Sequence, residues 1–257
     1  MTASMFIAHG SPMLAVETNT YASFLEELGR TMKRPKAVVL FTAHWESDPV
    51  AVSSSDEPYG TIHDFGGFPG ELYEIRYPAR GSSELAEETV SRLERKGIAA
   101  RKDESRGLDH GSWVPLRRMF PSADIPVVQV SVNPFRPVRE QFAIGEALRG
   151  LGGDDVLVIG SGSTVHNLRM LRPGAPAPEP WAVAFDDWLI GRMQERDGEA
   201  LCRYEELAPH AKTAVPRAEH LVPLFIAMGS AGPEAKGHVL HRSYEMGSLS
   251  YLCVRFD

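Results

Sequence analysis

The chain has 257 residues, of which 43% are hydrophobic and 24% charged, and its formal net charge is -7. These values are typical of a soluble globular protein with a sizeable core, organised as one domain or two small ones. Acidic and basic residues are interspersed and form no basic stripe, so we expect no nucleic-acid partner. Apolar runs stay far below the roughly 20 residues of a membrane span, so we expect no membrane partner either.

The N-terminal segment MTASMFIAHGSPM lacks the basic and long apolar regions typical of a signal peptide. Cys202 and Cys253 form no CxxC pair and have no metal-ligand spacing, so we expect both to be reduced thiols. These features favour a cytoplasmic location.

Short β-branched apolar runs alternate with amphipathic helical patterns along the chain. The expected strands are Met5–Ala8, Ala37–Ala43, Val50–Ser53, Pro126–Val132, Val156–Gly160, Gly237–His241 and Ser248–Phe256. The expected helices are Thr20–Met32, Ser83–Lys96, Arg136–Leu151, Trp181–Glu195 and Arg217–Met228. This alternation predicts an α/β fold, with one domain over residues 1–257 and a mostly parallel central sheet flanked by helices.

Two stretches interrupt the pattern. Ser54–Arg80 is rich in glycine, proline and aromatic residues, and we expect it to be an ordered loop over a site, because long loops in compact domains are usually functional or disordered. Arg172–Pro180, with the sequence RPGAPAPEP, is expected to be a mobile connector within the domain.

His9 and His44 occupy equivalent places, because each directly follows an apolar strand and a small residue. Ligands of open α/β sheets bind outside the carboxyl ends of the strands, so both side chains are expected to face one crevice. A single histidine at such a place is more often structural, but two of them favour a pair of metal ligands.

His166 follows the strand Val156–Gly160 through the turn SGST, and we expect it at the start of a helix. The helix dipole would lower its pKa and keep it neutral, as a general base or a further ligand. The same GSGST segment could bind phosphate, although it lacks the lysine and the glycine spacing of the known loops. His220 lies in the apolar segment PRAEHLVPLF, as a core histidine or a ligand, with Glu219 as an alternative ligand.

His110 lies in LDHGSWVPL, in an expected loop before a short helix, and Asp109 beside it could orient it. His210, His238 and His241 have solvent or strand contexts and are expected to be structural. Three to five histidines at one sheet edge favour Zn or Fe(II) over Mg or Ca. Because no cysteine belongs to the group, the site is expected to be open and catalytic.

Seven motifs follow one another over almost the whole chain: HGSPM (His9–Met13), TAHWE (Thr42–Glu46), TIHDFGGFP (Thr61–Pro69), LDHGSWVPL (Leu108–Leu116), GSGSTVHNL (Gly160–Leu168), EHLVPL (Glu219–Leu224) and EMGSLSYL (Glu245–Leu252). In these motifs the chain resembles the LigB superfamily of class III extradiol ring-cleaving dioxygenases, and within it the 4,5-DOPA dioxygenase-like branch.

The resemblance implies one metal ion per chain, Fe(II) or Zn(II), held by His9, His44 and His220. It implies that His166 is the acid–base histidine, or a fourth ligand, and that His110 contacts substrate or dioxygen. The three histidines replace the two-histidine, one-carboxylate set of many Fe(II) oxygenases, unless Glu219 or another acid takes part.

The implied reaction opens the aromatic ring of a DOPA-like catechol with dioxygen, and these two small molecules are the expected partners. We expect the pocket wall to contain His63, Phe65, Phe68 and Trp113, with Gly66 and Gly67 allowing the loop to move as a lid. Two other functions stay open: a zinc-dependent hydrolase on the same scaffold, and a non-catalytic metal-binding or interaction protein. The chain is expected to act as a monomer or a small homo-oligomer.

Overall fold

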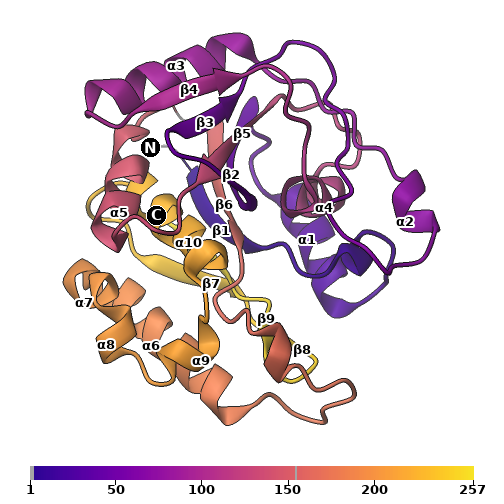
Figure 1. Cartoon of the computed structure of the whole chain (residues 1–257), viewed down its shortest axis with the longest axis vertical. Coiled ribbons are helices and arrows are strands. Elements are labelled where there is room, and N and C mark those ends of the chain that lie inside the picture. Colours follow the sequence, from indigo (N-terminus) through magenta and orange to yellow (C-terminus); the bar gives the residue numbers. More distant parts are fainter. Residues whose placement is uncertain (1–2, 154) are drawn as a thin grey trace.

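The apolar runs of the sequence pair into one eight-stranded sheet in the computed structural model, which describes residues 3–153 and 155–257 (Figure 1). The strand order is β4-β3-β5-β2-β6-β1-β10-β7. The strands are β1 (Ala3–Ala8), β2 (Ala37–Glu46), β3 (Val50–Ser53), β4 (Ala100–Asp103), β5 (Val127–Val132), β6 (Val156–Gly162), β7 (Gly237–His241) and β10 (Cys253–Phe256). A separate small ribbon pairs β8 (Tyr244–Glu245) with β9 (Leu249–Ser250).

The centre of the sheet is parallel, because β2 pairs with both β5 and β6, and β6 pairs with β1, in the same direction. Antiparallel pairs occur towards the two edges, where β3 meets β5 and where β10 lies between β1 and β7. The predicted α/β fold with a mostly parallel central sheet is therefore confirmed. Parallel pairing brings the carboxyl ends of β1, β2 and β6 to the same edge.

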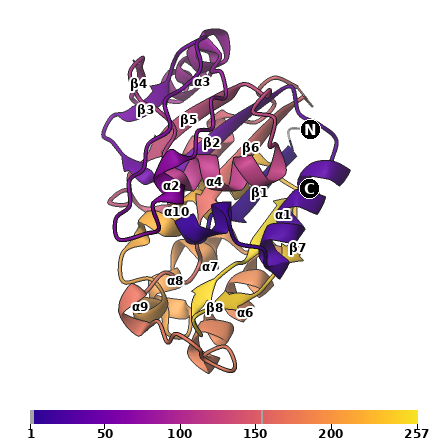
Figure 2. The same cartoon turned by 90° about the vertical axis from the view of Figure 1, so that its right-hand side faces the viewer.

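Helices cover both faces of the sheet (Figures 1 and 2). They are α1 (Thr20–Thr31), α2 (Glu71–Glu74), α3 (Ser83–Arg95), α4 (His110–Met119), α5 (Val138–Ala147), α6 (Pro180–Glu195), α7 (Gly198–Cys202), α8 (Tyr204–Leu207), α9 (Ala211–Ala214) and α10 (Val222–Ser230). Short 3-10 turns occur at Pro12–Ala15, Leu168–Met170 and Ala218–His220. None of the helices in the described part of the chain has the length and apolar composition needed to cross a membrane.

The central strands β5 and β6 are buried on both faces, because successive side chains point to opposite sides of a sheet that helices cover on both sides. In β2, Val38 and Leu40 pack in a core with residues of α1 and α4. Val39 and Phe41 pack in a second core with residues of α3, α5 and α10. A third core joins α6 and the short helices α7 to α9 to the β10 side of the sheet. These layers hold the strand ends, and the loops that follow them, in fixed positions.

The structure differs from the sequence-based elements at several boundaries. Strand β4 was not predicted, because its sequence ARKD is mostly polar and lies at a partly exposed edge. Helices α7 to α9 were not predicted because each spans only four or five residues. The expected strand Ser248–Phe256 is divided into β9 and β10, and the expected helix Arg217–Met228 into a 3-10 turn and α10.

The segment Ser54–Arg80 contains α2 and is connected to its surroundings by isolated bridges, one of them between Thr61 and Leu108. The segment Arg172–Pro180 is tied to the β8–β9 ribbon, because the Glu179 N–H donates to the Gly247 carbonyl at 2.7 Å and the Arg172 N–H to the Met246 carbonyl at 2.8 Å. Backbone hydrogen bonds therefore anchor both irregular segments beside the carboxyl edge of the sheet.

Candidate metal centre

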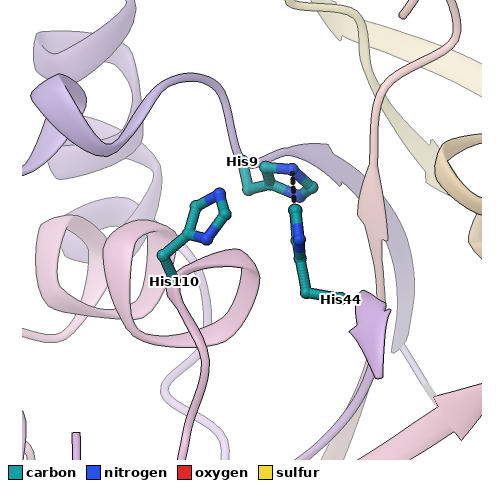
Figure 3. A group of neighbouring side chains, drawn as sticks. All are labelled: His9, His44 and His110. Carbon is teal, nitrogen blue, oxygen red and sulfur yellow. Dashed lines mark hydrogen bonds between the residues drawn. The ribbon is translucent and has the colours of Figure 1, made fainter. Parts of the chain in front are cut away.

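Five histidines from separate segments meet at the carboxyl edge of the sheet. They are His9 in the loop after β1, His44 within β2, His110 at the start of α4, His166 in the loop after β6 and His220 at the end of a 3-10 turn. Figure 3 shows three of them pointing toward one another from a loop, a strand and a helix. A cavity of about 370 Å³ opens beside the group and is lined by all of them except His220.

His9 is held through one ring nitrogen, which leaves the other facing His44. Its Nδ1 lies 3.1 Å from the Ser161 hydroxyl oxygen. Ser161 uses its own hydrogen to donate to the Gly111 carbonyl, so it accepts the proton of His9 Nδ1. The Nε2 of His9 therefore carries a lone pair.

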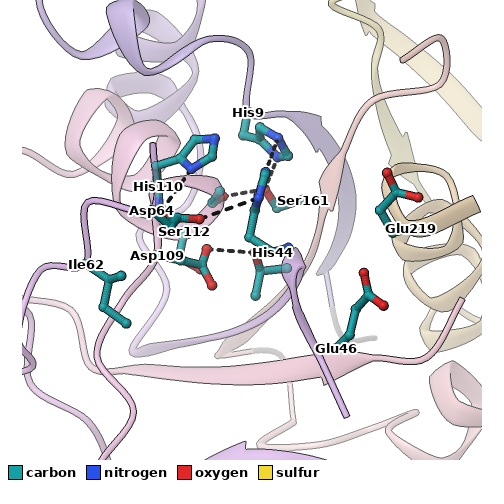
Figure 4. A network of polar contacts seen from close by, with 12 residues as sticks. His9, His44, Glu46, Ile62, Asp64, Asp109, His110, Ser112, Ser161 and Glu219 are labelled. Carbon is teal, nitrogen blue, oxygen red and sulfur yellow. Dashed lines mark hydrogen bonds and ion pairs between the residues drawn. The ribbon is translucent and has the colours of Figure 1, made fainter. Parts of the chain in front are cut away.

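His44 has the same arrangement on the opposite side (Figure 4). Its Nδ1 lies 3.5 Å from a carboxylate oxygen of Asp64, which can only accept a proton when ionised. Its Nε2 lies 3.1 Å from Nε2 of His9. Two lone pairs thus face each other at short range, and this arrangement is stable only when a proton or a cation lies between them.

His220 supplies a third nitrogen without a protein partner. Its Nδ1 lies 3.0 Å from Oε1 of Glu219, which accepts the Nδ1 proton. Its Nε2 is buried and makes no hydrogen bond within residues 3–153 and 155–257. Buried polar atoms are almost always satisfied, so an unpaired Nε2 indicates a missing ligand. Gly162 allows this close packing, because a Cβ there would clash with the His220 carbonyl oxygen.

Ring spacing distinguishes these three histidines from their neighbours. Two rings bound through Nε2 at about 2.1 Å, at angles of roughly 90–110°, would have centroids about 4.5–5.2 Å apart. The observed centroid distances are 4.8 Å for His9–His44, 5.1 Å for His9–His220 and 4.9 Å for His44–His220. His110 fits this spacing less well, with 4.0 Å to His44 and 5.4 Å to His9.

The distances between the possible ligand atoms divide these residues into two groups, and His220 is then not grouped with His9 and His44. The nitrogens of His9, His44 and His110 lie within 4.8 Å of one another, and those of His166 and His220 form a second group with a Glu219 oxygen. His220 differs from His110 in that its Nε2 is buried and makes no hydrogen bond within the described residues, and in its ring spacing to His9 and His44. Glu219 is engaged with Nδ1 of His220 and acts as its hydrogen-bond acceptor.

The electrostatics of the group favour a metal over a proton. Burial lowers the pKa of His9 and of His220 well below 6.5, and the neighbouring histidines lower both further. Burial also lowers the pKa of His44, and the neighbouring His110 and His220 lower it further. The three imidazoles are therefore neutral near pH 7, which is the form that binds metal ions.

His110 is oriented by Asp64 and not by Asp109. Its backbone N–H and its Nδ1 both donate to Oδ1 of Asp64, at 2.9 and 3.0 Å. Burial would raise the pKa of Asp64, but the hydrogen bonds from His110 lower it to about 2, so the carboxylate stays ionised. Asp109 instead accepts a hydrogen bond from Thr42 and pairs with Arg106. The sequence contained one signal for Asp64, its place directly after His63 in the loop motif.

His166 does not begin a helix, contrary to the sequence-based prediction. Its backbone N–H donates to the Ala214 carbonyl at 3.0 Å, and only the 3-10 turn Leu168–Met170 follows. Burial, and not a helix dipole, lowers its pKa. Its ring stacks on that of His220 with centroids 3.5 Å apart and also lines the cavity. His44 likewise lies inside β2 and not after it, because β2 continues to Glu46.

The expected pocket wall divides into two layers. Phe65 and Phe68 line the cavity. Trp113 is fully buried and donates from Nε1 to the Ile62 carbonyl, and His63 contacts the Ile75 carbonyl through Nε2. His63 and Trp113 therefore do not line the cavity but support Phe65, with ring centroids 5.7 and 6.3 Å from it.

The family model for the catalytic LigB subunit of aromatic ring-opening dioxygenases matches residues 3–254. The chain belongs to this family. The sequence-based resemblance is thus confirmed, and the chain is an extradiol ring-opening dioxygenase by relationship.

Several relatives agree with this assignment over nearly their whole length. A protein of Beta vulgaris named 4,5-DOPA dioxygenase extradiol is 41% identical, and the match covers 98% of this chain and 96% of the relative. A protein of the same name from Escherichia coli K12 is 36% identical, covering 98% and 93%. The crystal structure of an Escherichia coli K12 protein described as uncharacterized superimposes with a TM-score of 0.85 and 31% identity, over 100% of both chains.

Proposed function

We propose that the chain uses Fe(II), one ion per chain, to open the aromatic ring of a DOPA-like catechol with dioxygen. The observation that carries the proposal is that the ring centroids of His9, His44 and His220 lie 4.8 to 5.1 Å apart, each ring with an acceptor near its Nδ1, beside a cavity of about 370 Å³. Such a volume suits a small aromatic ligand. The names of the relatives from Beta vulgaris and Escherichia coli support DOPA as the model substrate.

The ion would be held by His9, His44 and His220, and bound Fe(II) would supply Lewis-acid activation of the diol and redox chemistry with dioxygen. Zinc has no redox chemistry, so it suits the structural geometry but not this reaction. Iron is therefore the proposed working metal. A zinc-dependent hydrolase on the same histidines is the alternative function, and the neutral three-nitrogen donor set is the observation in its favour.

The neighbouring residues have separate roles. Neutral His166, which lines the cavity, takes a proton from a catechol hydroxyl as general base. His110, held by Asp64, presents its free Nε2 to the substrate or dioxygen. Phe65 and Phe68 cover the aromatic ring and exclude water, which strengthens the polar interactions inside.

The test is aerobic turnover after anaerobic reconstitution. Protein loaded with Fe(II) is expected to consume dioxygen with L-DOPA and give a yellow product, and zinc-loaded protein is expected to consume none. A zinc form that hydrolyses esters or amides, with no oxygen uptake by the iron form, would contradict the proposal and favour the hydrolase.

The ligand set is tested by metal content. His9→Ala, His44→Ala and His220→Ala are each expected to lose bound metal, whereas His110→Ala and His166→Ala are expected to retain metal and lose turnover. If His110→Ala lost metal and His220→Ala kept it, the third ligand would be His110. A cytoplasmic location and action as a monomer or a small homo-oligomer stay predictions from the sequence.

A further inference from the structure

Asp186, on α6, is a fully buried carboxylate that has no part in the proposed reaction. Its oxygens accept hydrogen bonds from three hydroxyl groups, those of Thr164 at 2.6 Å, Tyr244 at 2.8 Å and Ser250 at 2.6 Å. A carboxylate that only accepts hydrogen bonds is in its ionised form. Asp186 therefore places a negative charge inside the protein, where three separate hydroxyls meet it.

This charge has no paired cation within the described residues. Arg242 pairs with Asp187 at 2.6 Å and donates from Nε to the Tyr244 hydroxyl at 2.8 Å, but it forms no ion pair with Asp186. A buried charge of this kind is costly, and apolar residues of similar volume are often at least as stabilising. Hydrogen bonds to a charged acceptor are short and strong, so they fix the positions of their donors. The arrangement favours a positioning role over a contribution to stability.

The three hydroxyls belong to two segments beside the metal centre. Thr164 is in the loop after β6, two residues before His166, and we call residues 163–167 the His166 loop. Tyr244 and Ser250 are directly paired residues of the β8–β9 ribbon. One carboxylate on α6 thus joins the His166 loop to the ribbon.

Further hydrogen bonds connect the same two segments directly. Ser163 Oγ lies 3.0 Å from the Val165 carbonyl oxygen and 2.9 Å from that of Ser250. The Ser250 N–H donates to the Val165 carbonyl at 3.2 Å. Because Ser250 also donates to Asp186, a shift of the ribbon would move the backbone next to His166.

Both segments form part of the cavity wall. His166 lines the cavity from its loop, and Glu245, Met246 and Leu249 line it from the ribbon. The distance between the proposed proton acceptor and the wall that a substrate contacts is therefore set by hydrogen bonds that meet at Asp186.

We propose that Asp186 is a positioning residue that holds the His166 loop and the β8–β9 ribbon in fixed places relative to each other. Through Thr164 it sets the approach of His166 to the substrate. Through Tyr244 and Ser250 it sets the cavity wall. The kinetic consequences rest on the proposed function, whereas the positions of the two segments do not depend on turnover.

Hydrogen exchange of the backbone amides tests these positions without a substrate. In Asp186→Ala three hydroxyls lose their acceptor, so exchange is expected to become faster in residues 163–167 and 244–252 and to stay unchanged in α3. Asp186→Asn is expected to restore most of the protection, because its amide oxygen still accepts hydrogen bonds and a hydroxyl can turn to accept from its N–H. Unchanged exchange in both segments of Asp186→Ala, or an equal increase over the whole chain, would overturn the proposal.

Removal of single hydroxyls separates the two kinetic effects. Thr164→Val is expected to lower kcat for L-DOPA about tenfold with KM unchanged, because it disturbs only the approach of His166. Tyr244→Phe is expected to raise KM about threefold to tenfold with kcat unchanged, because it disturbs only the cavity wall. Both variants are expected to keep the metal content of the wild type. An identical change of kcat and KM in the two variants would refute separate positioning of the two segments.

Thr89→Val and Tyr204→Phe are the matched controls, because each removes a hydroxyl from a buried residue elsewhere. Thr89 donates to the Leu85 carbonyl within α3, and Tyr204 is on α8. Both controls are expected to keep the kcat and KM of the wild type. A loss in the controls as large as that in Thr164→Val and Tyr244→Phe would mean that lower stability causes the effect, and the proposal would be wrong.

Exchange and turnover together separate this proposal from the proposed function. Faster exchange in the two segments of Asp186→Ala, with no oxygen uptake by the wild type on any catechol, would support the positioning by Asp186 and refute the dioxygenase function. Oxygen uptake by the wild type, with exchange and kinetics unchanged in Asp186→Ala, would refute the positioning and leave the dioxygenase function standing.

Discussion

Replacement of Glu219 tests whether acceptors on Nδ1 prepare the histidines for a metal. His220 is 5% exposed, and its Nδ1 donates to Glu219 at 3.0 Å. Glu219→Ala leaves that N–H buried and unpaired, which costs about 1–3 kcal/mol. Loss of such a partner typically lowers metal affinity about 10–100-fold, equivalent to about 1.4–2.8 kcal/mol, so the two estimates agree.

Glu219→Gln is the informative companion, because an amide oxygen can still accept the Nδ1 proton without the negative charge. We expect Glu219→Gln to lose less than about tenfold in metal affinity. The difference between Glu219→Ala and Glu219→Gln then measures the part of the effect that the hydrogen-bond acceptor contributes without its negative charge. Glu87→Gln is the control, since Glu87 pairs with Lys102 at 2.7 Å and neither residue contacts His220 or Glu219.

The assay is competition for Zn²⁺ or Co²⁺ against a chelator of known affinity, with the Co²⁺ absorption spectrum reporting ligand geometry. Urea unfolding of the metal-free variants measures their stability separately. Wild-type affinity in a folded Glu219→Ala protein would refute the reasoning, because the orientation of His220 would then not depend on Glu219.

Three further results are expected. Folded-state pKa values of His9, His44, His166 and His220 lie below 6.5, so the unfolded chain binds more protons below that pH. The contribution of these histidines to the stability of the metal-free protein is therefore fully present above about pH 6.5. It falls as the pH decreases, by up to about 1.4 kcal/mol per pH unit for each histidine. Urea unfolding between pH 7 and 5 checks this, and a free energy of unfolding that does not change with pH would contradict it. Gly111→Ala places a Cβ 2.7 Å from Thr42 Oγ1 and 2.9 Å from His44 Cδ2, and is expected to weaken Zn²⁺ binding in the chelator competition, whereas Gly66→Ala meets nothing within 4 Å and is the control. Zn²⁺ at 100 times its dissociation constant is expected to stabilise the protein by about 2.7 kcal/mol over the chelated form, and equal melting temperatures would exclude tight binding to the folded state.

The sequence predicted best those features that depend on residues close together in the chain. Long apolar runs such as those of β2 and β6 predicted the parallel sheet. Strands of such sheets are buried on both faces, so their sequences are continuously apolar and do not alternate between apolar and polar residues. The resemblance implied that His9, His44 and His220 hold one metal ion; their ring centroids lie 4.8 to 5.1 Å apart, and the ligand set itself stays a prediction.

The sequence pattern did not predict contacts between residues that lie far apart in the chain. Asp64 reaches His110 and Ser161 reaches His9, and neither pairing follows from spacing in the sequence. His166 was assigned to a helix start because SGST is typical of a cap, but Ser163 and Thr164 bond to Val165, Ser250 and Asp186 instead.

The placement of β1 between β6 and β10 determines when the site can be assembled during synthesis. Although His9 leaves the ribosome first, its strand has no partner until β6 has been made, and Tyr251 and Glu245 emerge hundreds of residues later. The three proposed ligands His9, His44 and His220 can therefore be assembled only after most of the chain, through residue 220, has been translated.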